Sequence, residues 1–293
     1  MRKLIYTTLL LAGSVHAQDF IRSETFARPI DQSADGRERA QYVLGTPSRK
    51  WSGGFVKWYY NPSSQPANLT TDEVVYAMKV AAKRWSDMCR VTFLYMGLTN
   101  AAPYMGSVAS LLDNKNVYGW ASTVTTNSLY DMNRWFDVFN NYTDVDIALN
   151  GLLPWNAAGV DAAMTSAIGF SIGLKTSDVS SAVMANVPSR DLAYDRTLRG
   201  DDIAGCAALY GANSFYADSN RAFNWAESAY SNILWPSPAE SSSYNGYYYR
   251  YYSGTDSLVA TKDDTVYYVG PDGVLQNLGP LVNYKNQVQS AGY

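Results

Sequence analysis

The sequence has almost no histidine. Its single histidine, His16, lies in a segment that we expect to be removed. A cationic start, an apolar run from Leu4 to Ala12 and an A-x-A-like site at Val15 to Ala17 are typical of a secretory signal peptide. Cleavage after Ala17 leaves a mature chain without histidine. This excludes Ser-His-Asp triads, Cys-His nucleophile pairs and imidazole-ligated metals from the mature protein.

Long apolar runs and an excess of positive charge are also missing. The apolar run of the signal is too short to span a bilayer, and no later run reaches that length. We therefore expect a secreted or periplasmic protein without a membrane span. The formal net charge is −3, and loss of two basic residues with the signal makes it more negative. Such a chain has no electrostatic basis for binding nucleic acid. Carboxylate-pair hydrolysis, Ser-Lys chemistry and oxygen-ligand calcium sites remain possible.

What is present is a glycine-containing stretch from Ser166 to Ser177, followed by a methionine at Met184. The stretch resembles the active-site helix, glycine turn and Met-turn of the matrixins, bacterial secreted type, which are metzincin zinc endopeptidases with the pattern H-E-x-x-H-x-x-G-x-x-H. Gly173 and Met184 match the glycine and the methionine of this pattern. The four residues that would carry the chemistry differ. The three zinc histidines fall on Ser166, Phe170 and Thr176, and the general-base glutamate falls on Ala167.

These four replacements remove the metal chemistry that the resemblance would otherwise imply. Serine and threonine hydroxyls are poor zinc ligands, phenylalanine is not a ligand, and alanine cannot accept a proton. We therefore expect no zinc and no other cofactor. Structural calcium remains possible, since matrixins often hold it. Phe170 is large and apolar, and we expect it to fill, as core, the volume of the metal and imidazoles.

The flanking elements resemble the remainder of a matrixin domain, which implies an α+β fold with a twisted mixed sheet, a long helix, an active-site-type helix and a closing helix. Alternation predicts strands at 55–60, 91–95 and 116–120, and helical spacing predicts a long helix after Thr70 or Thr71. Otherwise 101–141 shows no regular pattern.

Three further expectations concern the same domain. Residues 144–150 resemble the edge strand above the matrixin cleft, which pairs with substrate; the alternative is a plain sheet edge. Asp161 is expected to be the N-cap of the central helix. A closing helix is expected over 198–211, with Asp201 and Asp202 at its positive N-terminus and a glycine cap. Gly173, Met184, Asp201 and Asp202 are thus expected to have structural roles.

The resemblance divides the chain into five parts. We expect a signal peptide at 1–17, a leader or linker at 18–50, the matrixin-like domain at 51–212, a linker at 213–220 and a C-terminal module at 221–293. The last part resembles a small α/β-hairpin module appended to bacterial secreted proteins. Its predicted elements are a helix from Arg221 to Ile233, a polar loop at 237–245, strands at 246–252, 257–262, 265–269 and 274–278, and a helix opened by Pro280.

The tyrosines of the C-terminal module give a hint of binding. In the strand at 246–252, Tyr247, Tyr249 and Tyr251 point to one face and the intervening residues to the other. One face must be core, and the other could stack on sugar rings or contact a protein partner. The alternative is that tyrosine is simply a good strand residue.

Cys89 and Cys206 are the only cysteines. An even number in an exported protein favours one disulfide, and both cysteines recur at matching places in bacterial matrixin-like sequences. Two buried free thiols are the alternative.

The sequence therefore leaves three hypotheses for function. The first is a zinc-less matrixin homologue, a pseudoprotease that binds an unidentified protein or glycan. The second is an active zinc-dependent metalloendopeptidase, which a mature chain without histidine disfavours. The third is a hydrolase with a site rebuilt from carboxylates, although the nearest acid along the chain is Asp178.

Overall fold

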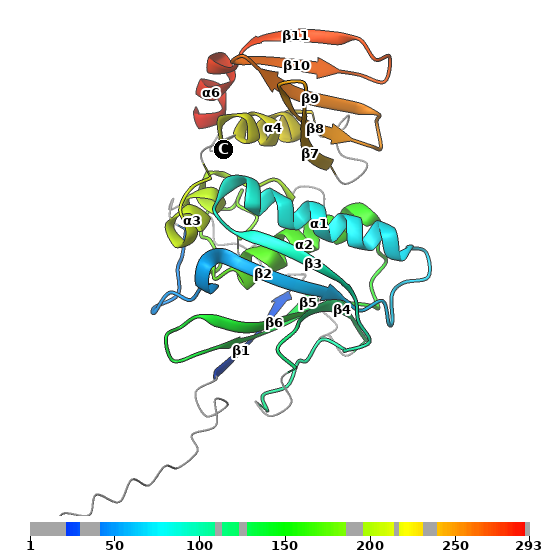
Figure 1. The fold of residues 1–293 in the computed structure, drawn as a ribbon, viewed down its shortest axis with the longest axis vertical. Coiled ribbons are helices and arrows are strands. Elements are labelled where there is room, and N and C mark those ends of the chain that lie inside the picture. The colour runs from blue at the N-terminus through cyan, green and yellow to red at the C-terminus, as the bar shows by residue number, and fades with distance from the viewer. Residues whose placement is uncertain are drawn as a thin grey trace, which may run out of the picture.

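The computed structural model describes residues 22–29, 42–108, 113–122, 128–185, 196–213, 217–230 and 239–290. Within these ranges the protein is an α+β fold with five α-helices and two β-sheets (Figure 1). Its buried apolar side chains form two clusters, a larger one between residues 51 and 209 and a smaller one between residues 223 and 266. The expected signal peptide at 1–17 lies outside the described residues.

The first sheet has six strands in the order β1-β5-β6-β4-β2-β3. They are β1 (Arg22–Pro29), β2 (Phe55–Tyr60), β3 (Thr92–Leu98), β4 (Asn116–Ala121), β5 (Ser128–Phe136) and β6 (Tyr142–Asn150). β2, β3, β4 and β6 are parallel, whereas β5 is antiparallel to β6 and β1 is antiparallel to β5. Helices α1 (Thr71–Met88) and α2 (Ala157–Ser171) pack against each other over one face of this sheet (Figure 1).

Local sequence explains the elements that were predicted. β2 has the predicted bounds, and every second residue, beginning with Val56, is buried. β3 and β4 match the predicted strands to within a few residues. α1 begins after Thr70, whose hydroxyl accepts a hydrogen bond from the Glu73 N–H, while the Glu73 carboxylate accepts one from the Thr70 N–H. This reciprocal pair is a capping box, which fixes the start of the helix.

The predicted edge strand at 144–150 is wrong. These residues belong to β6, which lies between β5 and β4 in the interior of the sheet. β5 was not expected, because it is buried at nearly every position and its sequence does not alternate. The outermost strands are β1 and β3. β1 comes from the stretch expected to be a leader or linker, so part of that stretch joins the sheet.

The expectation that Asp161 caps α2 is also wrong. The N-cap is Asn156, whose side chain accepts a hydrogen bond from the Gly159 N–H at 2.7 Å. Asp161 lies further along the helix and is fully buried, and its Oδ2 accepts a hydrogen bond of 2.8 Å from Arg84 Nη2 of α1. Asparagine and aspartate are equally good N-caps. Only the tertiary contact with Arg84 distinguishes the two positions.

The predicted disulfide is confirmed. Cys89, at the C-terminal cap of α1, is bonded to Cys206 in α3 (Gly200–Tyr210), with their Cα atoms 5.8 Å apart. The bond joins the first long helix to the closing helix. α3 has the predicted acidic first turn, and Gly211 ends it with a φ of 83°.

The C-terminal part has a five-stranded antiparallel sheet in the order β11-β10-β9-β8-β7. Its elements are α4 (Ala217–Ala229), β7 (Ala239–Tyr244), β8 (Tyr247–Tyr252), β9 (Ser257–Lys262), β10 (Thr265–Val269), β11 (Leu275–Pro280) and α6 (Leu281–Ser290). In Figure 1, α4 and α6 lie on the side of this sheet that faces α1.

In this part the central strands match the predictions, whereas the first helix, the first strand and the start of the last helix differ from them. β9 and β10 have the predicted bounds, β8 begins one residue later than predicted, and Asp263 and Asp264 form the predicted hairpin turn with positive φ. α4 begins at Ala217, inside the expected linker, and ends at Ala229. β7 replaces the polar loop, because its serines pair with β8 across the sheet. Pro280 ends β11 instead of opening the last helix.

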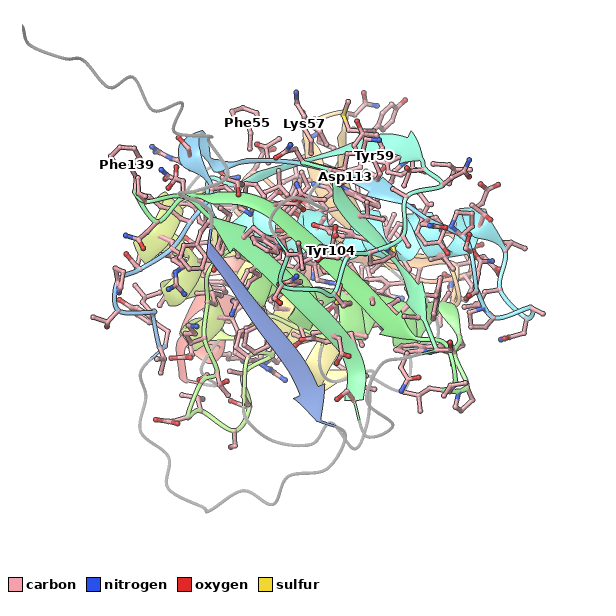
Figure 2. All side chains as sticks on the ribbon, turned by 90° about the horizontal axis from the view of Figure 1, so that it is seen from below. Phe55, Lys57, Tyr59, Tyr104, Asp113 and Phe139 are labelled. Atoms are coloured by element: carbon pink, nitrogen blue, oxygen red, sulfur yellow. A yellow bond between two sulfur atoms is a disulfide. The ribbon has the colours of Figure 1, made fainter. Side chains whose placement is uncertain are left out.

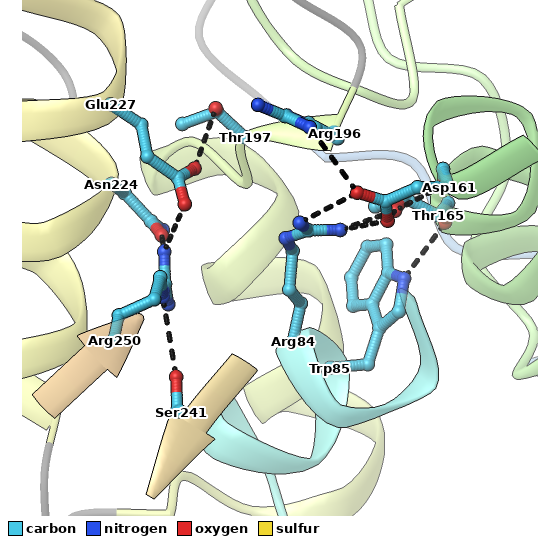
Figure 3. Close-up of polar contacts among 10 residues, drawn as sticks. All are labelled: Arg84, Trp85, Asp161, Thr165, Arg196, Thr197, Asn224, Glu227, Ser241 and Arg250. Atoms are coloured by element: carbon cyan, nitrogen blue, oxygen red, sulfur yellow. Dashed lines mark hydrogen bonds and ion pairs between the residues drawn. The ribbon is translucent and has the colours of Figure 1, made fainter. Parts of the chain in front are cut away.

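A buried polar network begins with Asp161 in the larger part of the protein (Figure 3). Asp161 is bound by Arg84 and also by Arg196, whose Nη1 lies 3.6 Å from Asp161 Oδ2. All three side chains are at least nine-tenths buried. Burial disfavours the charged form of Arg84, but Asp161 more than offsets this and raises its pKa.

The network continues into the C-terminal part through Thr197, the neighbour of Arg196. The Thr197 hydroxyl donates to Glu227 Oε2 of α4 at 3.1 Å, and Arg250 Nη1 of β8 lies 3.0 Å from Glu227 Oε1 (Figure 3). Burial opposes ionisation of Glu227, but Arg250, Arg84 and Arg196 together lower its pKa. The C-terminal part is therefore joined to the rest by buried charges as well as by the chain.

Candidate functional site

The residues at the first three zinc-motif positions lie in the second half of α2. This helix is buried at every position from Gly159 to Ser171, so Ser166, Ala167 and Phe170 are all enclosed by protein. Phe170 is only 1% exposed and belongs to the larger hydrophobic cluster. The prediction that Phe170 is a core residue is confirmed.

β5 supplies the polar neighbours of these positions. Tyr130 Oη lies 3.1 Å from Ser166 Oγ, and Arg134 Nη1 donates to the Phe170 carbonyl at 3.0 Å. Tyr130 and Arg134 are themselves buried. A guanidinium suits the C-terminal end of a helix, where the backbone carbonyls make the potential negative. The same positive charge repels a divalent cation.

The chain leaves α2 through a turn that requires glycine. Gly173 has a φ of 108°, and a Cβ built there would lie 2.0 Å from the Arg49 carbonyl oxygen. Beyond the turn Leu174 forms a β-bridge with Leu44, and Thr176 is partly buried. Three of the four motif positions are therefore in the core, and the fourth lies at its margin.

Met184 packs against α2, and Asp202 holds its turn in place. A Cβ at Gly169 would lie 2.4 Å from Met184 Sδ, so the methionine touches the helix backbone directly. Asp202 accepts hydrogen bonds from the backbone N–H groups of Val183, Met184 and Arg199 at 2.8–3.0 Å. Burial raises the pKa of Asp202 to about 6, although these three donors favour its ionised form.

The neighbouring acid of α3 has a similar task. Asp201 Oδ2 accepts a hydrogen bond of 2.5 Å from the Ser177 hydroxyl, which in turn accepts one from the Val179 N–H at 3.0 Å. Asp201 and Asp202 thus fix the segment between the glycine turn and the methionine. Their contacts are structural, and neither carboxylate contacts the four motif positions through any of these bonds.

The residues at the motif positions do not fit a zinc ion. A catalytic zinc needs three nitrogen, sulfur or carboxylate ligands and one open position for water. Here the side chains are two hydroxyls, a methyl group and a phenyl ring, beside a buried guanidinium. In the described ranges, no three histidine, cysteine or carboxylate side chains come together in a way that could hold a metal ion.

A pair of carboxylates lies on the opposite face of the six-stranded sheet. Val145 and Ile147 of β6 join the core with α2, so the alternate residues Asp144 and Asp146 face away from it. They are 1% and 3% exposed. Sequence reasoning treated Asp144 and Asp146 only as strand residues. The signal in the sequence that could have identified this pair is the presence of two acids at alternate positions of one strand.

The segment 101–108, which carries Tyr104, covers these two carboxylates, and Asp113 lies on the same face of the sheet (Figure 2). Asp146 accepts hydrogen bonds from the N–H groups of Tyr104 and Val117, both at 2.6 Å. Burial raises the pKa of both carboxyl groups, and the nearby charge of Asp113 adds to the effect; Asp146 further raises that of Asp144. This pair is enclosed, and the hydrogen bond from Tyr104 to Asp146 anchors the covering segment.

The tyrosines of β8 alternate as predicted. Tyr248, Arg250 and Tyr252 are buried on the face that packs against α4, whereas Tyr247, Tyr249 and Tyr251 lie partly exposed on the other face. The outer face is hollowed, with a cavity of about 640 Å³. We call its lining the tyrosine face; it consists of Ser242, Tyr244, Tyr247, Tyr249, Tyr251, Leu258, Ala260, Val269 and Leu275.

Strand register explains the hollow. Tyr249 lies opposite Ser242 of β7 on one side and Ala260 of β9 on the other. Two small side chains therefore flank one ring, while the rows on either side carry larger residues such as Tyr244 and Leu258. Sequence reasoning found the tyrosines of β8 but missed Tyr244 and Ala260, because their places follow from strand pairing.

The sequence matches no protein-family model and no curated protein at a significant level. Among the helices that the structure describes, none combines the length and the apolar character required to cross a bilayer.

Proposed function

We propose that the protein is an exported, zinc-less homologue of the matrixins that binds a protein or a glycan and does not cleave peptide bonds. The observation that carries this proposal is the burial of the motif positions. Ser166, Ala167 and Phe170 are packed into the core, where a working enzyme needs ligands, a base and an open position for water.

Several features support the matrixin-like scaffold. A buried helix follows the parallel strands, a turn that only glycine can make follows the helix, and a methionine packs back against the helix at Gly169. A closing helix then holds the methionine turn through Asp202. The order and contacts of these elements agree with the order of the motifs in the sequence.

The two alternative functions have less support. An active zinc-dependent metalloendopeptidase needs ligands that neither the motif positions nor a mature chain without histidine can supply. A hydrolase with a rebuilt carboxylate site needs exposed acids, but Asp144 and Asp146 are enclosed, and Asp146 already binds the backbone at Tyr104 and Val117. Asp178 is exposed and lies beyond the glycine turn.

The tyrosine face supports binding as the remaining role. Large aromatic side chains that remain accessible on a sheet contribute contact area at low entropic cost, and they are typical of recognition surfaces. The sheet does not need these rings for its own core, which lies on the other face with Tyr248 and Tyr252.

Proteolysis is the direct test. The purified mature protein is incubated with casein and with gelatin, with added zinc and with a chelator. We expect no cleavage in any condition. Cleavage that the chelator abolishes would refute the proposal, whereas cleavage that persists in the chelator would favour the carboxylate hydrolase.

A further inference from the structure

The chemistry of the tyrosine face points to one class of ligand. We propose that the tyrosine face binds a neutral polysaccharide, with the ring of Tyr249 as the central stacking surface. This inference rests on the binding role proposed above and adds the class of ligand to it.

Two rings of the tyrosine face, Tyr247 and Tyr251, are held in place before any ligand arrives. The Tyr251 hydroxyl donates to Asp256 Oδ1 at 2.9 Å. The ring of Tyr247 lies 4.6 Å from Lys262 Nζ and 5.5 Å from the ring of Tyr267, in an edge-to-face arrangement. A surface whose side chains are already ordered loses less entropy on binding than a mobile one.

The charge of the face favours an uncharged ligand. The nine lining residues are tyrosine, serine and aliphatic residues, and five of them carry hydroxyl groups. Charged residues lie beside the outer two rings of β8: Asp256 and Lys262 contact Tyr251 and Tyr247, and Glu240 is paired with Tyr251. The strand partners of the central Tyr249 are Ser242 and Ala260, so a charged ligand over this ring would lose water without gaining a counter-charge. A sugar presents an apolar C–H face to a ring and hydroxyls at its rim, which match tyrosine and serine.

The position of the hollow disfavours an extended peptide. Peptides that add to a sheet use unpaired main-chain groups at its edge. The hollow reaches from β7 to β11, and its centre lies over β8 and β9, where the strands are paired on both sides. The main-chain groups at its centre are therefore already used, and only side chains remain there to make contacts.

The spacing of the rings indicates a chain rather than a single sugar. Tyr247, Tyr249 and Tyr251 are alternate residues of one strand, so the Cα atoms of each successive pair lie about 7 Å apart along the strand. The three rings thus form a row along β8. Tyr249 is in the middle of this row, and the small side chains of Ser242 and Ala260 leave space on both sides of it.

Affinity electrophoresis of the full mature chain tests this proposal. The gels contain hydroxyethylcellulose, xylan or galactomannan as neutral probes and polygalacturonate as an anionic probe. We expect retardation by at least one neutral probe. Tyr249→Ala and Ala260→Leu, which fills the hollow, should each weaken binding at least about tenfold. Tyr249→Phe keeps the ring and should retain most of the binding. Phe139→Ser is the control, since this residue is 80% exposed in the turn between β5 and β6, away from the tyrosine face (Figure 2).

Several results would overturn the inference. These are no retardation by any neutral probe, retardation by polygalacturonate alone, or retardation that Tyr249→Ala and Ala260→Leu leave unchanged in variants with the parent circular dichroism spectrum. Binding of a proline-rich peptide at this face, with no polysaccharide bound, would also overturn it. That last result would leave the proposed binding function intact, and the casein assay tests the loss of proteolysis separately.

Discussion

Asp161 is the carboxylate on which the buried network of the larger part depends, and its replacement by asparagine is a demanding test of the packing described above. Asp161→Asn keeps the size of the side chain and removes its charge. Arg84 and Arg196 would then remain buried without the carboxylate that binds both of them. Asparagine can accept one hydrogen bond from Arg84, but it cannot neutralise two guanidinium groups.

The expected loss of stability is large. Removal of one partner from a buried ion pair costs about 3–5 kcal/mol, because the other charge stays desolvated and uncompensated. Total stabilities of folded proteins are only about 5–15 kcal/mol. With an m-value of about 3 kcal/mol/M in urea, the unfolding midpoint should fall by about 1 M or more.

Urea unfolding followed by circular dichroism measures this change, and the chain offers a matched control. Lys83 and Asp87 form an i,i+4 pair at the surface of the same helix as Arg84, with the Lys83 side chain 39% and the Asp87 side chain 11% exposed. Lys83→Ala should cost about 1 kcal/mol or less, because the Asp87 carboxylate stays in contact with solvent. If Asp161→Asn lay within about 1 kcal/mol of the parent, the two arginines would not need this carboxylate, and the account of the network would be refuted.

Three further predictions follow from other parts of the structure. Asp144→Asn should flatten the dependence of stability on pH. Because the pKa of Asp144 is raised in the folded state, the parent should lose up to about 1.4 kcal/mol of stability per pH unit above about pH 4. In thermal melts, the stability of the variant relative to the parent should therefore increase with pH. Parallel pH profiles of parent and variant, with exposed Asp178→Asn as control, would contradict this. Cys89→Ser should cost about 4–5 kcal/mol in the chain-entropy model, because the bond closes a loop of 117 residues; two free thiols found by mass spectrometry of the unreduced protein would speak against the bond. Restoration of the zinc motif should create a zinc site, measurable by calorimetry, if the backbone still has metzincin geometry. The four changes are Ser166→His, Ala167→Glu, Phe170→His and Thr176→His. Loss of the Phe170 ring should itself cost about 3–5 kcal/mol, and a folded variant that binds no zinc would mean that the geometry has drifted.

Elements with a local cause could be predicted from the sequence. β2 alternates, α1 has a capping box, and the hairpin at Asp263 and Asp264 has turn chemistry that only a few residues satisfy. The burial of Phe170 was also predictable, because a phenyl ring on a stripe of an apolar helix is better placed in a core than in a wet cleft.

Elements with a tertiary cause could not be predicted in this way. β5 is buried on both faces and carries no alternation, and β1 joins the sheet only because β5 offers it an edge. The role of Asp161 depends on Arg84, which is 77 residues away in the sequence. Likewise the hollow of the tyrosine face depends on the register that sets Ala260 opposite Tyr249.

The zinc content of the mature protein tests the central claim most directly. The protein is dialysed first against excess zinc and then against metal-free buffer, and its zinc is measured by mass spectrometry beside a chelator-treated sample. Since three of the four motif positions are buried and none of the four holds a good zinc ligand, the zinc content should be well below one ion per chain and equal in the two samples. One tightly held zinc ion per chain, lost only on treatment with the chelator, would contradict the account.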